Sequence, residues 1–174
     1  GSFDMAALPG NDGWDMVEWA ARQPWSNGKI GLVGKSYSGQ ILLHTAAARP
    51  PHLVCAMSAL TGSDAWQWYY RGGAMEFGFS LYWGTVILGW DLAEKTLGNT
   101  PALQRWKNLL EMYLADQQTF ADVIPLLDFK PAQIAPGVNL FATWASHPTA
   151  DAYWKRLSPS SYFSRIEIPI LHIG

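Results

Sequence analysis

The sequence predicts an α/β fold: a partial parallel β-sheet with flanking helices, interrupted by an inserted, aromatic-rich helical lobe. Near the start of the chain, two short apolar runs of strand length alternate with helical segments, and one more apolar run closes the chain. The predicted core covers residues 3–61 and 166–174, and the predicted insertion covers residues 62–165. Gly1-Ser2 has the composition of a cloning remnant and is left out of the fold prediction.

The first core elements follow from apolar spacing and from the residues that break helices. Apolar residues recur at helical spacing after the candidate cap Asn11, and Pro24 ends that pattern. The run before Ser36 is short, apolar and rich in branched side chains, which is typical of a buried strand. Small and apolar residues then continue without a breaker up to Pro50. We therefore expect a helix over 11–23, a strand over 29–34, a helix over 37–49 and a strand over 53–60.

The strand sequences indicate how the sheet is built. Both are nearly continuous apolar runs, which is typical of parallel strands in a sheet covered on both faces by helices. The single cysteine, Cys55, lies within the second run, so we expect a buried structural thiol. One cysteine cannot form a disulfide within the chain, which favours a reducing compartment such as the cytoplasm but leaves the localisation open. A last strand is expected over 166–173.

The insertion is helical and rich in aromatic residues. Residues 101–115 place apolar side chains on one face of a helix. The chain has ten tryptophans, concentrated between Trp66 and Trp154, which indicates a buried aromatic region or one that lines a pocket. The apolar face of the predicted helix consists of Leu103, Trp106, Leu109, Leu110 and Tyr113. The aromatic residues expected to form the core of the insertion are Trp66, Trp68, Trp83, Trp90, Tyr69, Tyr70 and Tyr82.

The composition excludes several classes of function. The formal net charge is −2, with 12 basic and 14 acidic residues and no run of like charge, so neither nucleic acid nor an anionic membrane surface is an expected partner. The uncharged, aromatic-rich stretch of residues 77–90 is shorter than the roughly 18 residues that a membrane-spanning helix needs. Four scattered histidines and one cysteine offer no pair with zinc-ligand spacing, so no metal is predicted. A small neutral substrate is the expected partner.

Ser36 is the candidate catalytic residue. The segment from Gly34 to Gly39 places this serine at a sharp turn between a strand and a helix, where small neighbours allow a strained backbone that exposes the hydroxyl. In this interpretation Ser36 is a nucleophile, and the backbone N–H of Tyr37 is an oxyanion donor at the positive end of the helix dipole. The alternative is that Ser36 only caps the helix. The local pattern leaves both interpretations open.

Two phosphate-binding motifs fit this turn poorly. Gly34-Lys35-Ser36 ends like a P-loop, but Lys29 stands where the first glycine of that motif belongs, and the residues between look like a strand. The glycines do not have the spacing of a dinucleotide-binding fingerprint either. No cofactor is therefore predicted.

Several longer strings carry a specific resemblance. They are Asp15, Glu18-Trp19, Gln23-Pro24-Trp25-Ser26-Asn27-Gly28-Lys29-Ile30-Gly31 and Gly34-Lys35-Ser36-Tyr37-Ser38-Gly39, followed by His147-Pro148, Asp151, Tyr153-Trp154 and the ending Ile168 to Gly174. Together they resemble the Xaa-Pro dipeptidyl-peptidase and cocaine esterase (CocE/NonD) family, most weakly between about Phe77 and Pro136. The elbow of that family, Gly-x-Ser-Tyr-x-Gly, accounts for Ser38 standing before Gly39.

The resemblance implies a partial α/β-hydrolase fold with a helical cap, and a serine hydrolase of esters or amides that works through an acyl-enzyme. It also implies an oxyanion tyrosine upstream of this chain, and an aspartate and a histidine downstream of Gly174, so we expect this chain to be a fragment with little activity alone. Trp66, Trp68 and Tyr69 are the candidates for substrate binding. The resemblance does not choose between proline-linked peptides, amino-acid esters, β-lactam side-chain amides and aryl esters.

No histidine of this chain is expected to serve as the base. His44 lies two helical turns after Ser36, about 12 Å along the axis, whereas a general base must lie about 3 Å from its proton donor. His52, His147 and His172 are expected to be structural. The alternative function is a non-catalytic binding or assembly module that uses the aromatic cap, and open sheet edges would allow self-association.

Overall fold

The described residues of the chain form two compact units. The computed structural model describes residues 9–116, 125–128 and 140–174. Of these residues, unit 1 comprises 9–68 and 150–174, and unit 2 comprises 69–116, 125–128 and 140–149. Residues 62–68 and 150–165 were expected in the insertion, but they belong to the same unit as the sheet. The reason is packing, because the segment after residue 150 lies against helix α2 of the core.

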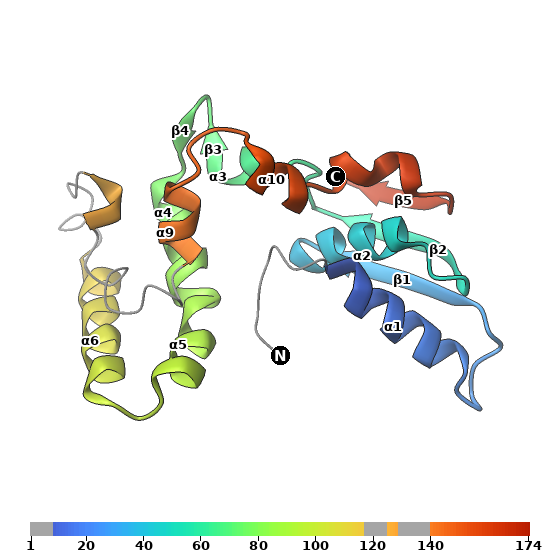
Figure 1. The fold of residues 1–174 in the computed structure, drawn as a ribbon, viewed down its shortest axis with the longest axis horizontal. Helices are drawn as coiled ribbons and strands as arrows, with labels where there is room; N and C mark the ends of the chain where they lie inside the picture. The colour runs from blue at the N-terminus through green and yellow to red at the C-terminus, as the bar shows by residue number, and fades with distance from the viewer. Residues whose placement is uncertain (1–8, 117–124, 129–139) are drawn as a thin grey trace. The chain divides into compact units, whose positions relative to one another are not determined.

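The sheet of unit 1 is parallel and has the order β1-β2-β5 (Figure 1). Its strands are β1 (Ile30–Lys35), β2 (Leu53–Ala59) and β5 (Ile170–Ile173). Lys35 pairs with Ala59, which pairs with Ile173, so the carboxyl ends of all three strands meet at one edge. The prediction of parallel strands is confirmed. The last strand begins four residues later than predicted, after the 3-10 helix η3 (Pro159–Arg165) and Pro169.

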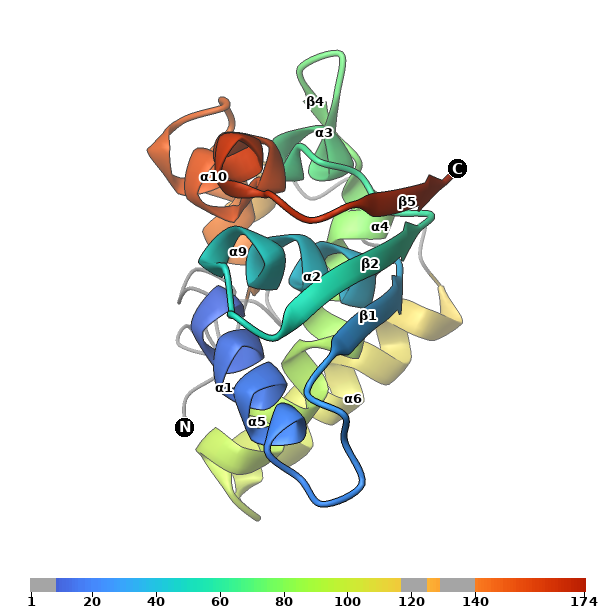
Figure 2. The same ribbon diagram turned by 90° about the vertical axis from the view of Figure 1, so that its right-hand side faces the viewer.

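Two helices cover one face of this sheet, as Figure 2 shows. They are α1 (Pro9–Ala21) and α2 (Tyr37–Ala48). Val17 of α1 and Ala46 of α2 pack with Leu53 of β2, and Leu42 and Leu43 of α2 pack with the same face. Both helices lie within two residues of their predicted bounds. Unit 1 also holds α10 (Ala152–Leu157) and most of α3 (Ala65–Tyr69).

The opposite face of the sheet is open, which corrects two predictions. Val33 is 74% exposed and Leu171 is 59% exposed, and both belong to the face that α1 and α2 do not cover. The expected cover on both faces is therefore absent from the described part of the chain. Cys55 lies on this open face and is exposed, so the prediction of a buried thiol is wrong. Side chains alternate between the two faces of a strand, which places Cys55 opposite the buried Ala56.

Unit 2 is helical around an aromatic core. Leu81, Tyr113 and Phe141 form one cluster, and Tyr69 stacks on Trp144 with ring centroids 4.0 Å apart. Its elements are β3 (Tyr70–Arg71), β4 (Ala74–Met75), α4 (Phe77–Leu81), the π-helix η1 (Tyr82–Ile87), α5 (Gly89–Leu97), α6 (Pro101–Ala115), the 3-10 helix η2 (Leu126–Asp128) and α9 (Leu140–Ala145).

The bounds of α6 agree with the prediction for 101–115, because Thr100 caps its first turn and Pro101 starts it. Four of the five residues predicted on its apolar face are buried, namely Leu103, Trp106, Leu110 and Tyr113. The aromatic-core prediction is confirmed for Tyr69 and Tyr70 and is wrong for Tyr82, which is exposed. The side chain of Trp90 lies outside the described residues. Among the described helices, none is both long and apolar enough to cross a bilayer.

Candidate active site

Ser36 lies in the turn between β1 and α2, at the carboxyl edge of the parallel sheet. Its backbone has φ 56° and ψ −124°, in a region that residues other than glycine rarely adopt. The Ser36 N–H donates to the Ala59 carbonyl at 2.9 Å, which ties the turn to the end of β2. Such strain persists only where the surrounding structure enforces it, and it concentrates at functional sites.

Two glycines make this turn possible. A Cβ atom added to Gly34 would lie 2.5 Å from the Ser38 carbonyl oxygen and 2.9 Å from the Gly39 nitrogen, which are backbone atoms that cannot move aside. A Cβ on Gly39 would lie 3.1 Å from Ser58 Oγ and 3.1 Å from Thr61 Cβ. The spacing Gly34-x-Ser36-x-x-Gly39 therefore follows from close packing inside the turn and between the turn and β2.

The first turn of α2 presents backbone N–H groups next to Ser36. The first hydrogen bond of the α-helical kind runs from the Gln40 N–H to the Ser36 carbonyl at 3.1 Å. The N–H groups of Tyr37, Ser38 and Gly39 come before it, where a helix has no carbonyl of its own to offer them. The Ser36 side chain makes no capping hydrogen bond to this turn. The capping alternative thus lacks the contact that defines it.

Gln40 and His44 hold α2 against the end of α10. The Gln40 Nε2 donates to the Leu157 carbonyl at 2.9 Å, and the His44 Nε2 donates to the same oxygen at 3.0 Å. Both side chains are buried. Burial lowers the pKa of His44, and the hydrogen bond to Leu157 opposes this shift only partly. His44 is therefore a packed residue. The role of Gln40 was not predicted, because its partner lies 117 residues away in the sequence.

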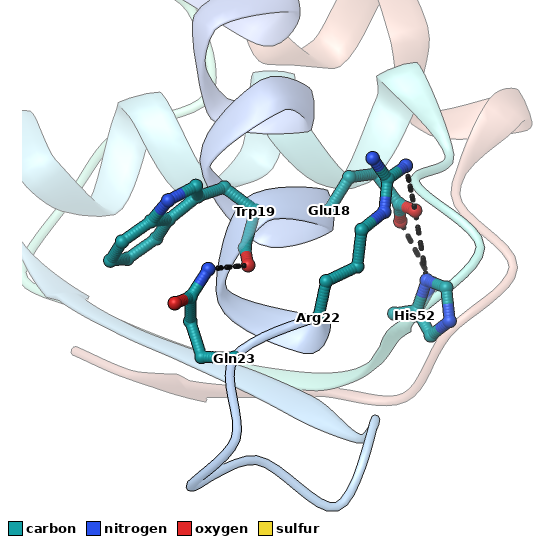
Figure 3. A network of polar contacts seen from close by, with 5 residues as sticks. All are labelled: Glu18, Trp19, Arg22, Gln23 and His52. Atoms are coloured by element: carbon teal, nitrogen blue, oxygen red, sulfur yellow. Dashed lines mark hydrogen bonds and ion pairs between the residues drawn. The ribbon is translucent and has the colours of Figure 1, made fainter.

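Glu18 and His52 form a second polar contact, shown in Figure 3. The His52 Nδ1 lies 2.8 Å from Glu18 Oε2, and the His52 backbone N–H donates to Glu18 Oε1 at 3.2 Å. Burial raises the pKa of Glu18, but the His52 hydrogen bonds and the charges of His52 and Arg22 outweigh it, so the pKa is lowered overall. His52 also accepts the Ile30 N–H through its carbonyl, at the amino end of β1, away from the carboxyl edge where Ser36 lies.

The three aromatic candidates for substrate binding have different surroundings. Trp66 and Trp68 are half-buried, and the Trp68 indole lies so close to Gly62 that a Cβ there would overlap its Nε1. Tyr69 is only 4% exposed and packs on Trp144 in unit 2. Asp64 accepts the Trp66 N–H at 2.9 Å, so its carboxylate is engaged at the start of α3.

Asp151, His172 and His147 belong to other elements than this turn. Asp151 caps α10 by accepting the N–H groups of Tyr153 and Trp154. His172 lies on β5 and His147 follows α9. Over residues 9–116, 125–128 and 140–174, no group of three or more His, Cys, Asp or Glu side chains is placed to hold a metal ion.

A strained serine between a parallel strand and a helix, at the carboxyl edge of the sheet, defines the α/β-hydrolase class of fold. The comparisons with known proteins agree with this class. The model of the X-Pro dipeptidyl-peptidase family S15 matches residues 1–174. The chain belongs to this family of hydrolases.

A cocaine esterase from Rhodococcus sp. (strain MB1 Bresler) is 25% identical over 167 residues, which are 92% of this chain and 28% of that protein. A CocE/NonD family hydrolase from Staphylococcus aureus is similar in structure with a TM-score of 0.61 and 22% identity, over 97% of this chain and 23% of that one. An α-amino acid ester hydrolase has a TM-score of 0.58 at 19% identity, over 99% of this chain and 26% of that one. This chain therefore spans about a quarter of the length of these relatives.

Proposed function

We propose that this chain carries the nucleophile of a serine hydrolase that cleaves esters or amides. The observation that carries the proposal is the backbone of Ser36, held at φ 56° between β1 and α2 with no capping bond from its hydroxyl. An enzyme stabilises such strain where a side chain must stand clear of its neighbours. Membership of a hydrolase family adds support.

In the proposed reaction, Ser36 Oγ attacks the carbonyl carbon of the substrate and gives its proton to a general base. The tetrahedral oxyanion accepts a hydrogen bond from the Tyr37 N–H. Collapse breaks the bond to the alcohol or amine, which leaves with that proton, and water then hydrolyses the acyl-enzyme. The family resemblance implies a histidine base outside these 174 residues. Within this chain, the rings of His44 and His52 contact the Leu157 carbonyl and the Glu18 carboxylate.

Labelling with a fluorophosphonate, followed by intact mass, tests the nucleophile. In the full-length protein we expect one adduct, lost in Ser36→Ala and retained in Ser38→Ala, a matched control two residues away. The 174-residue chain alone should remain unlabelled, because the Ser36 hydroxyl stays protonated without a base. Labelling of full-length Ser36→Ala at the same rate as wild type would refute the proposal.

The open face of the sheet favours a second candidate, a module that associates with another chain. Val33, Leu171 and Ile173 are exposed on it or at its edge, and apolar patches of this kind mark interaction surfaces. β1 and β5 are also the outer strands of the described sheet. If Ser36→Ala leaves every activity of the full-length protein intact, this candidate replaces the first.

A further inference from the structure

A second strained residue, Leu60, lies directly beside Ser36. β2 ends at Ala59, which pairs with Lys35, and the Ala59 carbonyl accepts the Ser36 N–H at 2.9 Å. Leu60 is the next residue, and its N–H donates to the Ile173 carbonyl at 2.8 Å. The backbone of Leu60 is thereby fixed between the ends of β1 and β5, at the carboxyl edge of the sheet.

The conformation of Leu60 is unfavourable for a leucine. Its φ is 47°, in the left-handed region where the Cβ of an L-residue crowds its own backbone and where glycine fits without strain. The side chain is also 56% exposed, so burial among the described residues does little to offset that strain. A bulky, apolar, exposed side chain on a strained backbone is typical of a functional position.

Leu60 lies close enough to Ser36 to contact a substrate bound there. Neighbouring strands lie about 4.8 Å apart, and the carbon under attack must lie about 3 to 3.5 Å from the nucleophilic oxygen. Substituents on that carbon therefore fall within the roughly 4 to 4.5 Å at which apolar side chains make contact. In parallel sheets, ligands bind outside the carboxyl ends of the strands, which is where Leu60 stands.

We propose that Leu60 is a specificity-determining residue that contacts an apolar acyl group of the substrate bound at Ser36. This inference rests on the proposed function and adds the chemical class of the acyl group. The Leu60 side chain excludes water from the acyl group, which favours substrates with acyl chains longer than acetyl. The backbone strain at Leu60 is retained for this reason.

The test compares p-nitrophenyl acetate with p-nitrophenyl butyrate, which share a leaving group and differ in acyl length, on the full-length protein. In Leu60→Gly we expect the ratio of kcat/KM for butyrate to that for acetate to fall roughly tenfold, as for lost contact with one or two methylene groups. Leu60→Met, which keeps an apolar side chain of similar volume, should retain the wild-type ratio. An unchanged ratio in Leu60→Gly overturns the inference.

A second series fixes the acetyl group and varies the alcohol. Selectivity among alcohols should be the same in wild type and Leu60→Gly, and a change confined to this series overturns the assignment to the acyl group. The Tm of Leu60→Gly should not fall, because glycine relieves the strained φ. A lower Tm with equal losses on both acyl esters would make Leu60 structural and also overturn it. Hydrolysis that persists in Ser36→Ala refutes the proposed function instead, so the two failures are distinguishable.

Discussion

Ser36 depends on residues that have no side chain. Gly34 faces the Ser38 carbonyl at a distance that no Cβ could occupy, and the contact is with rigid backbone. Gly39 lies against Ser58 and Thr61, and Ser58 is almost fully buried. The exposed position of the serine is therefore produced by close packing beneath it.

Gly34→Ala should distort this turn. We expect a loss of about 1 to 3 kcal/mol in the free energy of unfolding, as for other overpacked sites, together with loss of fluorophosphonate labelling in the full-length protein. Chemical denaturation measures the first effect and intact mass the second. Gly78→Ala is the matched control, because a Cβ there meets no atom within 4 Å in helix α4. Equal stability of Gly34→Ala and wild type would contradict the close approach.

At the scale of elements, polar contacts hold the helices of unit 1 in place at two points. At one, Gln40 and His44 tie α2, which starts at the elbow, to the last carbonyl of α10. At the other, Glu18 of α1 holds His52 in the loop before β2. Each contact contains a group with a shifted pKa, so each predicts its own dependence of stability on pH.

The contact at His44 should weaken on mild acidification. Burial lowers the pKa of His44 from its ordinary value of 6.5, so the folded chain favours the neutral ring. Its stabilising effect is complete above pH 6.5 and is lost as the pH falls through the lower folded pKa. We expect the Tm of wild type to fall between pH 7 and pH 5 and that of His44→Gln to fall less. His172→Gln, on the exposed end of β5, serves as control and should follow wild type.

Glu18 should act in a more acidic range. Its pKa lies below the ordinary 4.5, because the His52 hydrogen bonds outweigh the opposing effect of burial. Its contribution to stability is present above pH 4.5 and is lost as the pH falls through the folded value. Glu18→Gln should therefore lower the Tm at pH 6 and flatten its decline below pH 4.5, measured by circular dichroism. Asp15→Asn removes a charge from an exposed position on the same helix, and an equal effect there would contradict the prediction.

These elements also separate what could be predicted from sequence from what could not. The strand, elbow and helix around Ser36 are local, so apolar spacing and the glycines predicted them within one or two residues. The hydrogen bond from Gln40 to Leu157 joins residues 117 positions apart, and no rule based on sequence spacing predicts such a contact. The exposure of Cys55 was not predicted for a related reason. An apolar run predicts a strand whose faces are covered by other elements, but those elements lie elsewhere in the sequence, so the run does not show whether they are present.

At the scale of the whole molecule, the open face of the sheet is an apolar surface that the described residues leave uncovered. A shallow apolar depression of about 550 Å³ lies on β1, β2 and β5, and its lining includes Gly31, Val33, Cys55 and Leu171. Contiguous apolar surface in water favours association, at about 25 cal/mol for each Å² that becomes buried. The 174-residue chain should therefore self-associate through this face.

Static light scattering over a range of concentrations measures that association. We expect the mass of the wild-type chain to rise with concentration, and Val33→Lys or Leu171→Lys to bring it back towards the monomer, because a charge desolvated in the interface opposes burial. Met112→Lys is the matched control: this residue is 58% exposed on α6, which is an element of unit 2 and not of the sheet, and its variant should associate like wild type. If wild type stays monomeric throughout, the face does not bind a second copy, and the module candidate loses the observation that favours it.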